Sequence, residues 1–311
     1  MSNSKILVTG ATGLHGGVGG HTARLLREMG ADVRALVRSR DQRSEGLEKL
    51  GIETVVGDFM NLQSLRDAMS GVDRAIFCYP INAGLLEAAL NMAAAARDAK
   101  LRILIDLSLI PARDGSPSDE AREHWLVSQM FDWAGLNVVH LMGGFFYENL
   151  EILAGPDMVK RGVLEAPFGD GDTPIAWVAG EDVARFAAAV LLQPDRYVGG
   201  TRYVTGPEAV TFRQVADIAS EAFGKLIRYD SGISIEAWAR RLREHRLGND
   251  RLVKHASVLA YAFGKTKASF GQATNEVLSA SGVVPMSLKE YLSRNRAAFG
   301  VEDSLRSSGA G

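Results

Sequence analysis

Short apolar segments alternate with amphipathic segments over the first 140 residues of the chain. The apolar segments are rich in β-branched residues and lie at 5–10, 32–38, 53–57, 72–78, 101–107 and 137–141. The segments between them have helical spacing, at 21–30, 62–69, 85–99 and 125–134. Strands that alternate with helices of this length form βαβ units, and strands that are apolar at nearly every position are covered on both faces. The pattern predicts an α/β fold with a Rossmann-type, doubly wound parallel sheet.

The pattern changes after residue 141. Residues 142–171 are glycine-rich and irregular, and the chain from 235 to 299 is mostly helical. The segment 111–122, rich in Pro, Ser, Asp and Glu, predicts a mobile surface loop. We expect three parts: a sheet domain over 1–142 to which 175–205 returns, a smaller, mainly helical domain over 143–174 and 206–303 that closes over the sheet edge, and a flexible tail over 304–311.

A glycine-rich turn follows the first predicted strand. Gly10, Gly13 and Gly16 are spaced three residues apart. In this arrangement the first glycine makes a tight turn, the second allows close approach of a pyrophosphate, and the third allows close packing of helix on sheet. The amino end of the next helix supplies free N–H groups for phosphates. We therefore predict a dinucleotide site formed by Gly10, Ala11, Thr12, Gly13, Leu14, His15 and Gly16.

Two alternatives remain open at this turn. It can be a purely structural glycine turn, and His15 can be an exposed loop residue rather than a phosphate or nicotinamide contact. The further glycines at 17, 19 and 20 predict that the helix begins late, near residue 20 or 21.

The other strand ends supply the remaining candidate cofactor contacts, because ligands of doubly wound sheets bind at the carboxyl ends of the strands. Asp58 suits the adenine amino group, with Phe59 beside the ring. The ribose and nicotinamide are expected at the ends of the fourth and fifth strands. The candidates there are Cys78, Tyr79, Pro80 and Ser108. Cys78 has no basic neighbour in sequence, so we interpret it as a packing residue.

The second predicted strand ends in arginine, where an NAD-specific site usually carries an acid. A guanidinium favours a ribose 2′-phosphate by charge and by bidentate geometry. We therefore predict that NADP(H) is preferred over NAD(H) and is contacted by Arg38. The alternative is that Arg34, Arg38, Arg40 and Arg43 form only a solvated basic edge.

Composition narrows the possible partners. The 311 residues carry 35 Lys and Arg against 37 Asp and Glu, a balance that argues against a nucleic-acid partner. The arginine-rich segment 235–252 is accordingly expected to be a solvated helix face. The one cysteine excludes an internal disulfide and a cysteine-rich zinc site, and we expect no metal. No apolar run is long enough to span a bilayer, and the first residues do not resemble a signal peptide, so a cytoplasmic protein is expected.

Several segments together resemble the NmrA-like family, whose members are atypical, extended short-chain dehydrogenases/reductases. They are 8–16, 36–38, 57–58 and Gly143-Gly-Phe-Phe-Tyr-Glu-Asn-Leu150, followed by 181–184, 203–206 and 284–291. Within the family the chain resembles triphenylmethane-dye reductase and NAD(P)H quinone reductase-like members. The resemblance implies NADP(H) binding, together with either reduction of a small molecule or redox sensing.

The chain departs from its relatives in two places. Its glycine loop is about two residues longer than is usual in the family. Short-chain dehydrogenases carry Tyr-x-x-x-Lys after the fifth strand, whereas the matching segment 124–133 holds neither Tyr nor Lys. Ser108 alone cannot perform the usual proton transfer.

Two hypotheses follow. The chain is an NADPH-dependent reductase that transfers hydride to a small electron-poor acceptor such as a quinone, dye, imine or enone, or it is a non-catalytic redox sensor that acts through protein partners. A reductase of this kind needs little acid help. A monomer or homodimer is expected in either case.

Candidate residues for the reaction come from the segments after the fifth and sixth strands. Tyr147 and His124 are the candidate acids, although Tyr147 can equally be a packed aromatic residue. Phe145, Phe146 and Trp177 are candidate substrate contacts, and His140, inside an apolar strand, is expected to be a core histidine.

Overall fold

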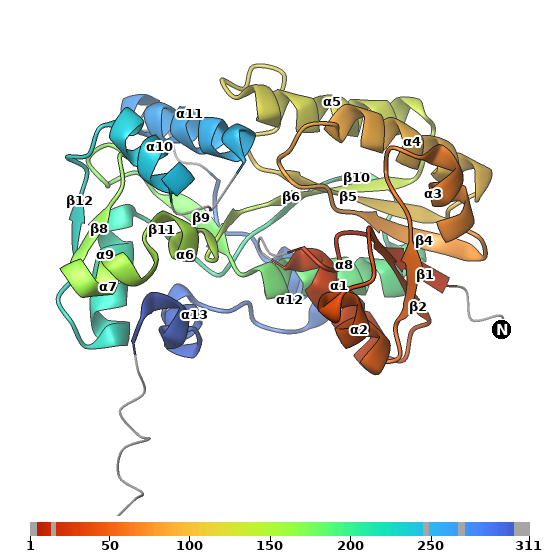
Figure 1. Ribbon diagram of the computed structural model, residues 1–311, viewed down its shortest axis with the longest axis horizontal. Helices are drawn as coiled ribbons and strands as arrows, with labels where there is room; N and C mark the ends of the chain where they lie inside the picture. Colours follow the sequence, from red (N-terminus) through yellow and green to blue (C-terminus); the bar gives the residue numbers. More distant parts are fainter. Residues whose placement is uncertain (1–4, 14–16, 245–248, 267–270, 302–311) are drawn as a thin grey trace, which may run out of the picture.

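The computed structural model describes residues 5–13, 17–244, 249–266 and 271–301 (Figure 1). The largest sheet in these ranges has seven strands, all parallel. Their spatial order is β10 (Gly200–Val204), β6 (Val138–Gly143), β5 (Ile103–Leu109), β4 (Val72–Phe77), β1 (Lys5–Val8), β2 (Val33–Val37) and β3 (Glu53–Val56). The strand order reverses between β1 and β4, and doubly wound sheets bind their ligands at this position. The predicted α/β fold is confirmed.

Helices cover both faces of this sheet (Figure 1). One face carries α1 (Val18–Glu28), α2 (Gln42–Lys49), α8 (Gly180–Leu192) and, against α8, α12 (Glu276–Ser281). The other face carries α3 (Leu62–Ala68), α4 (Leu85–Asp98) and α5 (Asp119–Trp133). The alternation along β1 shows why both faces are needed, because Ile6 and Val8 pack into the first layer while Leu7 packs into the second.

A smaller, mainly helical part follows in the chain. Its two small sheets have the orders β11-β9-β7 and β12-β8, formed by β7 (Phe145–Phe146), β8 (Val163–Glu165), β9 (Ile175–Val178), β11 (Ala209–Val210) and β12 (Arg228–Asp230). Its helices are α6 (Asn149–Leu153), α7 (Gly155–Arg161), α9 (Phe212–Phe223), α10 (Ile235–Glu244), α11 (Asp250–Thr266) and α13 (Leu288–Arg294). Packed aromatic rings, among them Phe168, Phe212 and Trp238, hold it together.

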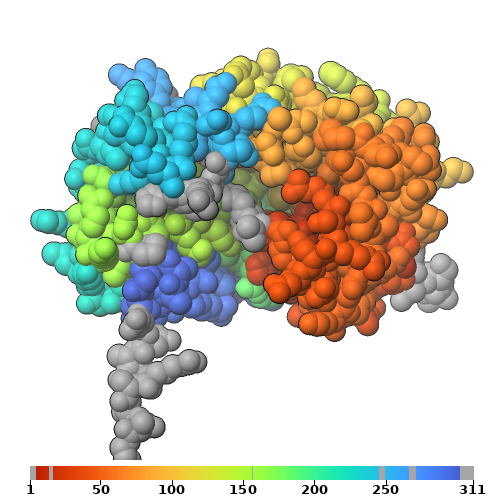
Figure 2. Space-filling model, in the orientation of Figure 1, coloured from red at the N-terminus to blue at the C-terminus, as the bar shows by residue number. Residues whose placement is uncertain are grey.

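The segment 175–205 is divided between the two parts. Helix α8 packs against α1, and β10 pairs with β6, so both lie with the large sheet. Strand β9 instead pairs with β7 and β11. Figure 2 shows the red and orange sheet part meeting the green-to-blue smaller part near the middle of this face. Among the described residues, no helix combines the length and apolar character that crossing a membrane requires.

Two predicted boundaries are wrong. Helix α1 begins at Val18 rather than near residue 20 or 21, because Gly17 adopts a left-handed conformation with φ of 57° and stands at the N-cap. Helix α5 begins at Asp119, so the end of the predicted mobile loop 111–122 is helical. The Ser118 hydroxyl accepts a hydrogen bond from the Ala121 amide at 3.3 Å and caps this helix. The predicted tail, 304–311, lies outside the described residues.

Helix α11 covers the start of α5 and connects the two parts. His255 Nδ1 lies 2.7 Å from the buried Ser118 hydroxyl. Lys254 pairs with Asp119 at 2.5 Å, and Arg251 pairs with Glu123 at 2.5 Å. Segment 235–252 is therefore not only a solvated face, because Arg251 contacts another helix. Ser118 is buried for the same reason, although the composition around it suggested a surface loop.

We expect the α5–α11 contact to weaken in acid. Burial lowers the pKa of His255 to about 4, below its ordinary value of 6.5. Between these values the unfolded chain takes up a proton that the folded chain does not, so the contribution of His255 is complete above pH 6.5 and is lost as the pH falls to 4. Urea unfolding of His255→Gln and the wild type should show a stability difference that shrinks by on the order of 2–3 kcal/mol between pH 7 and pH 4.

Lys254→Gln is the matched control, since it removes an exposed ion pair of the same helix without removing a titrating histidine. Its stability difference from the wild type should stay nearly constant over this range. A His255→Gln difference that is equally constant would contradict the buried, neutral state of His255.

Candidate functional site

The glycine turn lies where β1 ends, next to the end of β4. Gly10 has φ of 68°, a conformation that favours glycine, and its carbonyl accepts a hydrogen bond from the Gly13 amide at 3.0 Å. A Cβ atom on Gly10 would lie 2.8 Å from Cys78 Cβ. The turn is therefore pressed against the end of β4, and Ala11 behind it is buried. Leu14, His15 and Gly16 lie outside the described residues.

The close contact between helix and sheet occurs at Gly19. A Cβ atom there would lie 2.5 Å from the Thr9 carbonyl oxygen and 2.6 Å from backbone atoms of Gly10. The sequence predicted this packing role for Gly16, which lies outside the described residues; within them, Gly19 makes such a contact.

Thr9 is a residue that the sequence analysis missed. Its hydroxyl donates to the Ile76 carbonyl at 2.9 Å and accepts from the Cys78 amide at 2.8 Å. The side chain therefore joins the ends of β1 and β4 below the glycine turn. Burial raises the pKa of the Cys78 thiol, with a further contribution from the charge of Asp106. Cys78 is a packed, protonated thiol at this edge.

The four arginines of the predicted basic edge have different surroundings. Arg34 donates to the backbone carbonyls of Ala68 and Ser70, at 2.8 Å each, and to Glu53. It therefore holds β2, β3 and the end of α3 together, away from the glycine turn. Arg38 and Arg40 are exposed and form no ion pair with the described residues.

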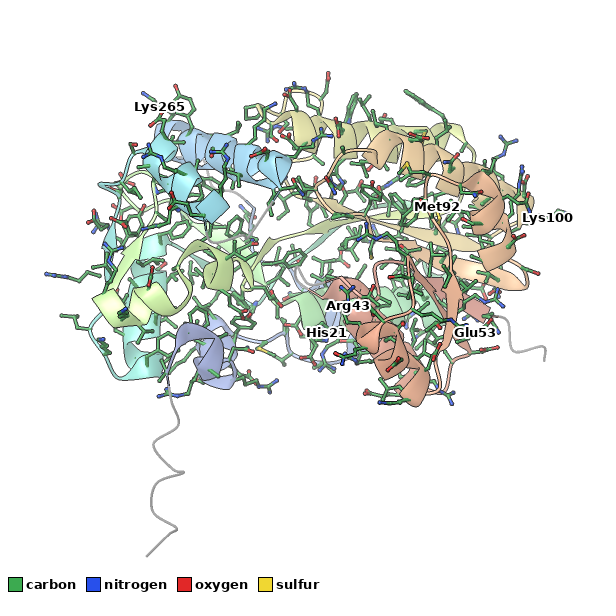
Figure 3. The ribbon with its side chains drawn as sticks, in the orientation of Figure 1. His21, Arg43, Glu53, Met92, Lys100 and Lys265 are labelled. Carbon is green, nitrogen blue, oxygen red and sulfur yellow. The ribbon has the colours of Figure 1, made fainter. Side chains whose placement is uncertain are left out.

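Arg43, in contrast, contacts the glycine turn directly. Its Nη1 atom donates to the Thr12 carbonyl at 2.9 Å, and its Nε atom donates to Asp41 at 3.1 Å. Asp41 is the N-cap of α2 and accepts from the Ser44 amide. In Figure 3, Arg43 and His21 lie on the side of the sheet part that faces the smaller part. A cation is therefore fixed beside the turn.

The positions after β3 and β4 are adjacent to each other. The Phe59 ring contacts the rings of Phe77 and Tyr79, with centroids 5.4 and 5.5 Å away. Tyr79 donates to the Ala83 carbonyl, and Pro80 is exposed. Asp58 is exposed, and its carboxylate accepts from the Met60 amide at 3.0 Å. Asp58 can therefore face a ligand, while most of the Phe59 ring is used in packing.

Ser108 and His124 are buried between β5 and α5. The Ser108 hydroxyl and both ring nitrogens of His124 have no hydrogen-bond partner among the described residues. Burial lowers the pKa of His124 to about 4, so the ring is neutral at pH 7. Beside them lies Asp106, a buried acid that the sequence analysis missed. An ionisable residue inside an apolar strand was the signal that could have identified it.

His140 is a core histidine, and its partners are acidic. Its Nδ1 atom lies 2.9 Å from Asp106 Oδ2, and its Nε2 atom lies 3.0 Å from Asp132 Oδ1. Burial alone would lower the pKa of His140, but the two carboxylates outweigh burial and raise the pKa.

The candidate residues of the smaller part lie in its core. Tyr147 is fully buried, its hydroxyl donates to the Met286 carbonyl at 3.3 Å, and burial raises its pKa. Trp177 is also fully buried and donates from its ring nitrogen to the Val210 carbonyl. Both side chains serve packing in this conformation. Phe145 and Phe146 are only half-buried, so they retain surface for a ligand.

The structure thus brings together the glycine turn, Cys78, Arg43 and the ends of β3 and β4. Tyr147 and Trp177 lie instead in the core of the smaller part. Within the described ranges, no group of three or more His, Cys, Asp or Glu side chains is placed to share a metal ion.

Comparison with known proteins gives a consistent result. A model described as the NmrA-like family matches residues 2–292. An NAD(P)H azoreductase from Xenophilus azovorans is 29% identical over 226 residues, which are 72% of this chain and 76% of the relative. An NADPH-dependent quinone oxidoreductase from Escherichia coli, solved with NADPH, superposes with a TM-score of 0.80 at 24% identity and covers 93% of this chain and 99% of its own.

A regulator is equally similar in fold. NmrA, a negative transcriptional regulator solved with NADP, gives a TM-score of 0.78 at 18% identity, covering 95% of this chain and 96% of its own. At these identities the two solved structures establish the shared fold.

The packing at Gly19 generates a prediction. Gly19→Ala places a methyl group against backbone atoms that cannot move without distorting β1, so we expect destabilisation by about 1–3 kcal/mol. Gly46→Ala is the matched control, because Gly46 lies inside α2 and a Cβ there meets nothing within 4 Å. That variant should be unchanged or more stable by up to about 1 kcal/mol. Urea unfolding measures both, and equal stability of the two variants would refute the close contact.

Proposed function

Because the chain belongs to the NmrA-like family, we propose that it is an NADPH-dependent reductase that transfers hydride to a small electron-poor acceptor. The observation that carries the proposal is the glycine turn at the carboxyl end of β1, where a side chain on Gly10 or Gly19 would strike backbone or Cys78. Such a turn leaves main-chain atoms accessible to a pyrophosphate at the switch point of the sheet. The names of the azoreductase and quinone oxidoreductase relatives support the choice of reaction.

The residues present fit a nicotinamide dinucleotide. Gly10, Ala11, Thr12 and Gly13, followed by the amino end of α1, would hold the pyrophosphate. The exposed carboxylate of Asp58 would receive the adenine amino group, and Ser108 would lie beside the nicotinamide end. When bound, the nicotinamide supplies the hydride.

We propose that residues of the sheet part, rather than residues of the smaller part, supply the proton. The Tyr147 hydroxyl is occupied by the Met286 carbonyl and is held protonated by burial. The ring nitrogens of His124 are unpartnered within the described residues and lie in the layer that carries Ser108. We therefore favour His124 over Tyr147 as the residue nearest to proton transfer. Phe145 and Phe146 remain the proposed substrate contacts.

We further propose a preference for NADP(H). Arg38 is exposed at the end of β2, and Arg43 is fixed on the glycine turn by Thr12 and Asp41. Two guanidinium groups near the predicted ribose position favour a 2′-phosphate over a hydroxyl.

A second function is supported by two observations. The segment 124–133 lacks Tyr and Lys, and the regulator NmrA shares the fold with NADP bound. The chain would then be a redox sensor that binds NADP(H) without turnover and acts through a protein partner.

Turnover distinguishes the two functions. The purified protein should oxidise NADPH steadily with a menadione-like quinone, an azo dye or a cationic triphenylmethane dye, followed as loss of absorbance at the NADPH band. Binding of NADPH is measured in parallel by fluorescence. Tight binding without turnover across this acceptor panel would reject the reductase and favour the sensor.

The cofactor preference has its own test. Arg38→Glu should weaken NADPH binding about tenfold or more by placing a negative charge near the 2′-phosphate, while NADH binding changes little. Arg66→Glu is the matched control, because Arg66 is also exposed but pairs with Asp98 at the end of α4. Isothermal titration with both nucleotides measures the ratio of affinities. An unchanged ratio in Arg38→Glu would remove Arg38 from the site.

A further inference from the structure

A file of polar side chains is buried between α5 and the strands β5 and β6. Asp132 Oδ1 lies 3.0 Å from His140 Nε2, and the other nitrogen of that ring lies 2.9 Å from Asp106 Oδ2. The Asp132 side chain is 55% exposed, whereas those of His140 and Asp106 are 4% and 1% exposed. Hydrogen bonds therefore connect solvent to a carboxylate inside the sheet without a break.

The inner end of this file consists of polar atoms that have no partner among the described residues. They are Asp106 Oδ1, the Ser108 hydroxyl oxygen and both ring nitrogens of His124. Asp106 and Ser108 share one face of β5, and Ser128 of α5 donates to Asp106 Oδ2 at 2.8 Å. His124 lies one turn before Ser128 and interacts with the charge of Asp106. Buried polar atoms are nearly always hydrogen-bonded, so such a group indicates a place built for a small polar partner such as water.

The inner end lies at the edge where the cofactor is proposed to bind. Asp106 is in register with Phe77 at the end of β4, and its charge acts on Cys78. Cys78 in turn lies against the glycine turn, since a Cβ atom on Gly10 would be 2.8 Å from Cys78 Cβ. Ser108 is the penultimate residue of β5. The file thus runs from a solvent-exposed carboxylate to the carboxyl end of the sheet.

We propose that this file conducts the proton that accompanies hydride transfer, with Asp132, His140 and Asp106 carrying it from solvent to an inner end formed by His124 and Ser108. This inference rests on the proposed reductase function. The acceptor gains a hydride with its electron pair from the nicotinamide and a proton from the inner end. For each proton that the inner end delivers, Asp106 returns one to it, His140 gives its Nδ1 proton to Asp106 and takes one at Nε2 from Asp132, and Asp132 takes one from solvent. Tautomeric exchange of His140 from the Nε2–H to the Nδ1–H form then resets the file.

The chemistry of the two histidines suits this role. His140 is hydrogen-bonded at both ring nitrogens, so it can gain a proton on one side and release one on the other. The His124 ring is neutral, and neither of its nitrogens has a hydrogen-bond partner among the described residues. None of these side chains is argued to touch the substrate directly, apart from those of the inner end. The alternative is that Asp132, His140 and Asp106 only stabilise the packing of α5 on the sheet. An experiment must therefore respond to protons and not to packing.

Two acceptors with different proton demands provide that experiment. A quinone needs a hydride and a proton, whereas a triphenylmethane cation needs only the hydride, because its central carbon is neutralised by it. In Asp106→Asn and His124→Gln, kcat with menadione should fall by about 10²-fold or more. With the cationic dye, kcat should stay within about threefold of the wild type. Asp132→Asn, at the exposed end, should shift the ratio in the same direction without risk to folding.

Ser128→Ala is the matched control. It removes a hydrogen bond to the same Asp106 oxygen but leaves the path from Asp132 to His124 intact, so the ratio of quinone to dye turnover should not change. Equal losses with both acceptors in Asp106→Asn and Asp132→Asn, or no loss with the quinone, would overturn the relay while leaving the reductase in place. A wild type that turns over neither acceptor would overturn the reductase, and the relay with it.

A second readout does not depend on turnover. In the cofactor-free protein, the ring N–H protons of His140 should exchange with solvent through Asp132. Nitrogen-15 NMR of the imidazoles should show this exchange slowed at least about tenfold in Asp132→Asn, with the fold and the Ser128→Ala exchange rate unchanged. An exchange rate that Asp132→Asn leaves untouched would show that the file does not conduct protons.

Discussion

The passage of α1 across the end of β1 is the contact on which the site depends. At Gly19 the helix and strand backbones are so close that a single methyl group would overlap the Thr9 carbonyl. This approach places the amino end of α1 next to the carboxyl ends of β1 and β4, where Thr9 joins the two strands. Gly10 can then turn directly over Cys78. The loop is thus shaped by backbone packing below it, and the fixed position of Arg43 on Thr12 follows from the same geometry.

The other face of the sheet is governed by charge rather than by close packing. An ionised carboxylate within a sheet is unfavourable unless it is paired and hydrogen-bonded. The Oδ2 atom of Asp106 contacts His140 and accepts from Ser128, both of which come from elements next to β5, whereas its Oδ1 atom has no partner among the described residues. Helix α5 is consequently fixed at its centre by Asp106 and at its start by α11, through Ser118 and His255. One helix therefore connects the sheet, the proposed site and the smaller part.

The sequence was sufficient for features that depend on neighbouring residues. Apolar runs located the strands of the parallel sheet, and the helical segment predicted at 62–69 is α3, which Asn61 caps. It was insufficient where contacts join distant residues. Ser118 and His255 are 137 positions apart, so the polar segment around Ser118 resembled a loop until α11 covered it. The spacing of the glycines did not identify Gly19 as a packing residue, because its contact with Thr9 depends on the path of α1 over β1. Asp106 and His140, 34 positions apart, became partners through strand pairing.

The loss of Tyr and Lys from the segment 124–133 does not by itself favour a sensor over an enzyme. A protein that only binds a dinucleotide gains nothing from polar atoms left unpartnered in its interior, because each of them lowers stability. Among the described residues, four of the eight such atoms belong to Asp106, Ser108 and His124, and the other four are distributed over Thr22, Ser116, Glu148 and Trp238. Departures from good packing persist where function maintains them. Asp106, beside Ser108 and His124, is joined to the exposed Asp132 through His140, and this connection is the structural argument for a proton path in the proposed function.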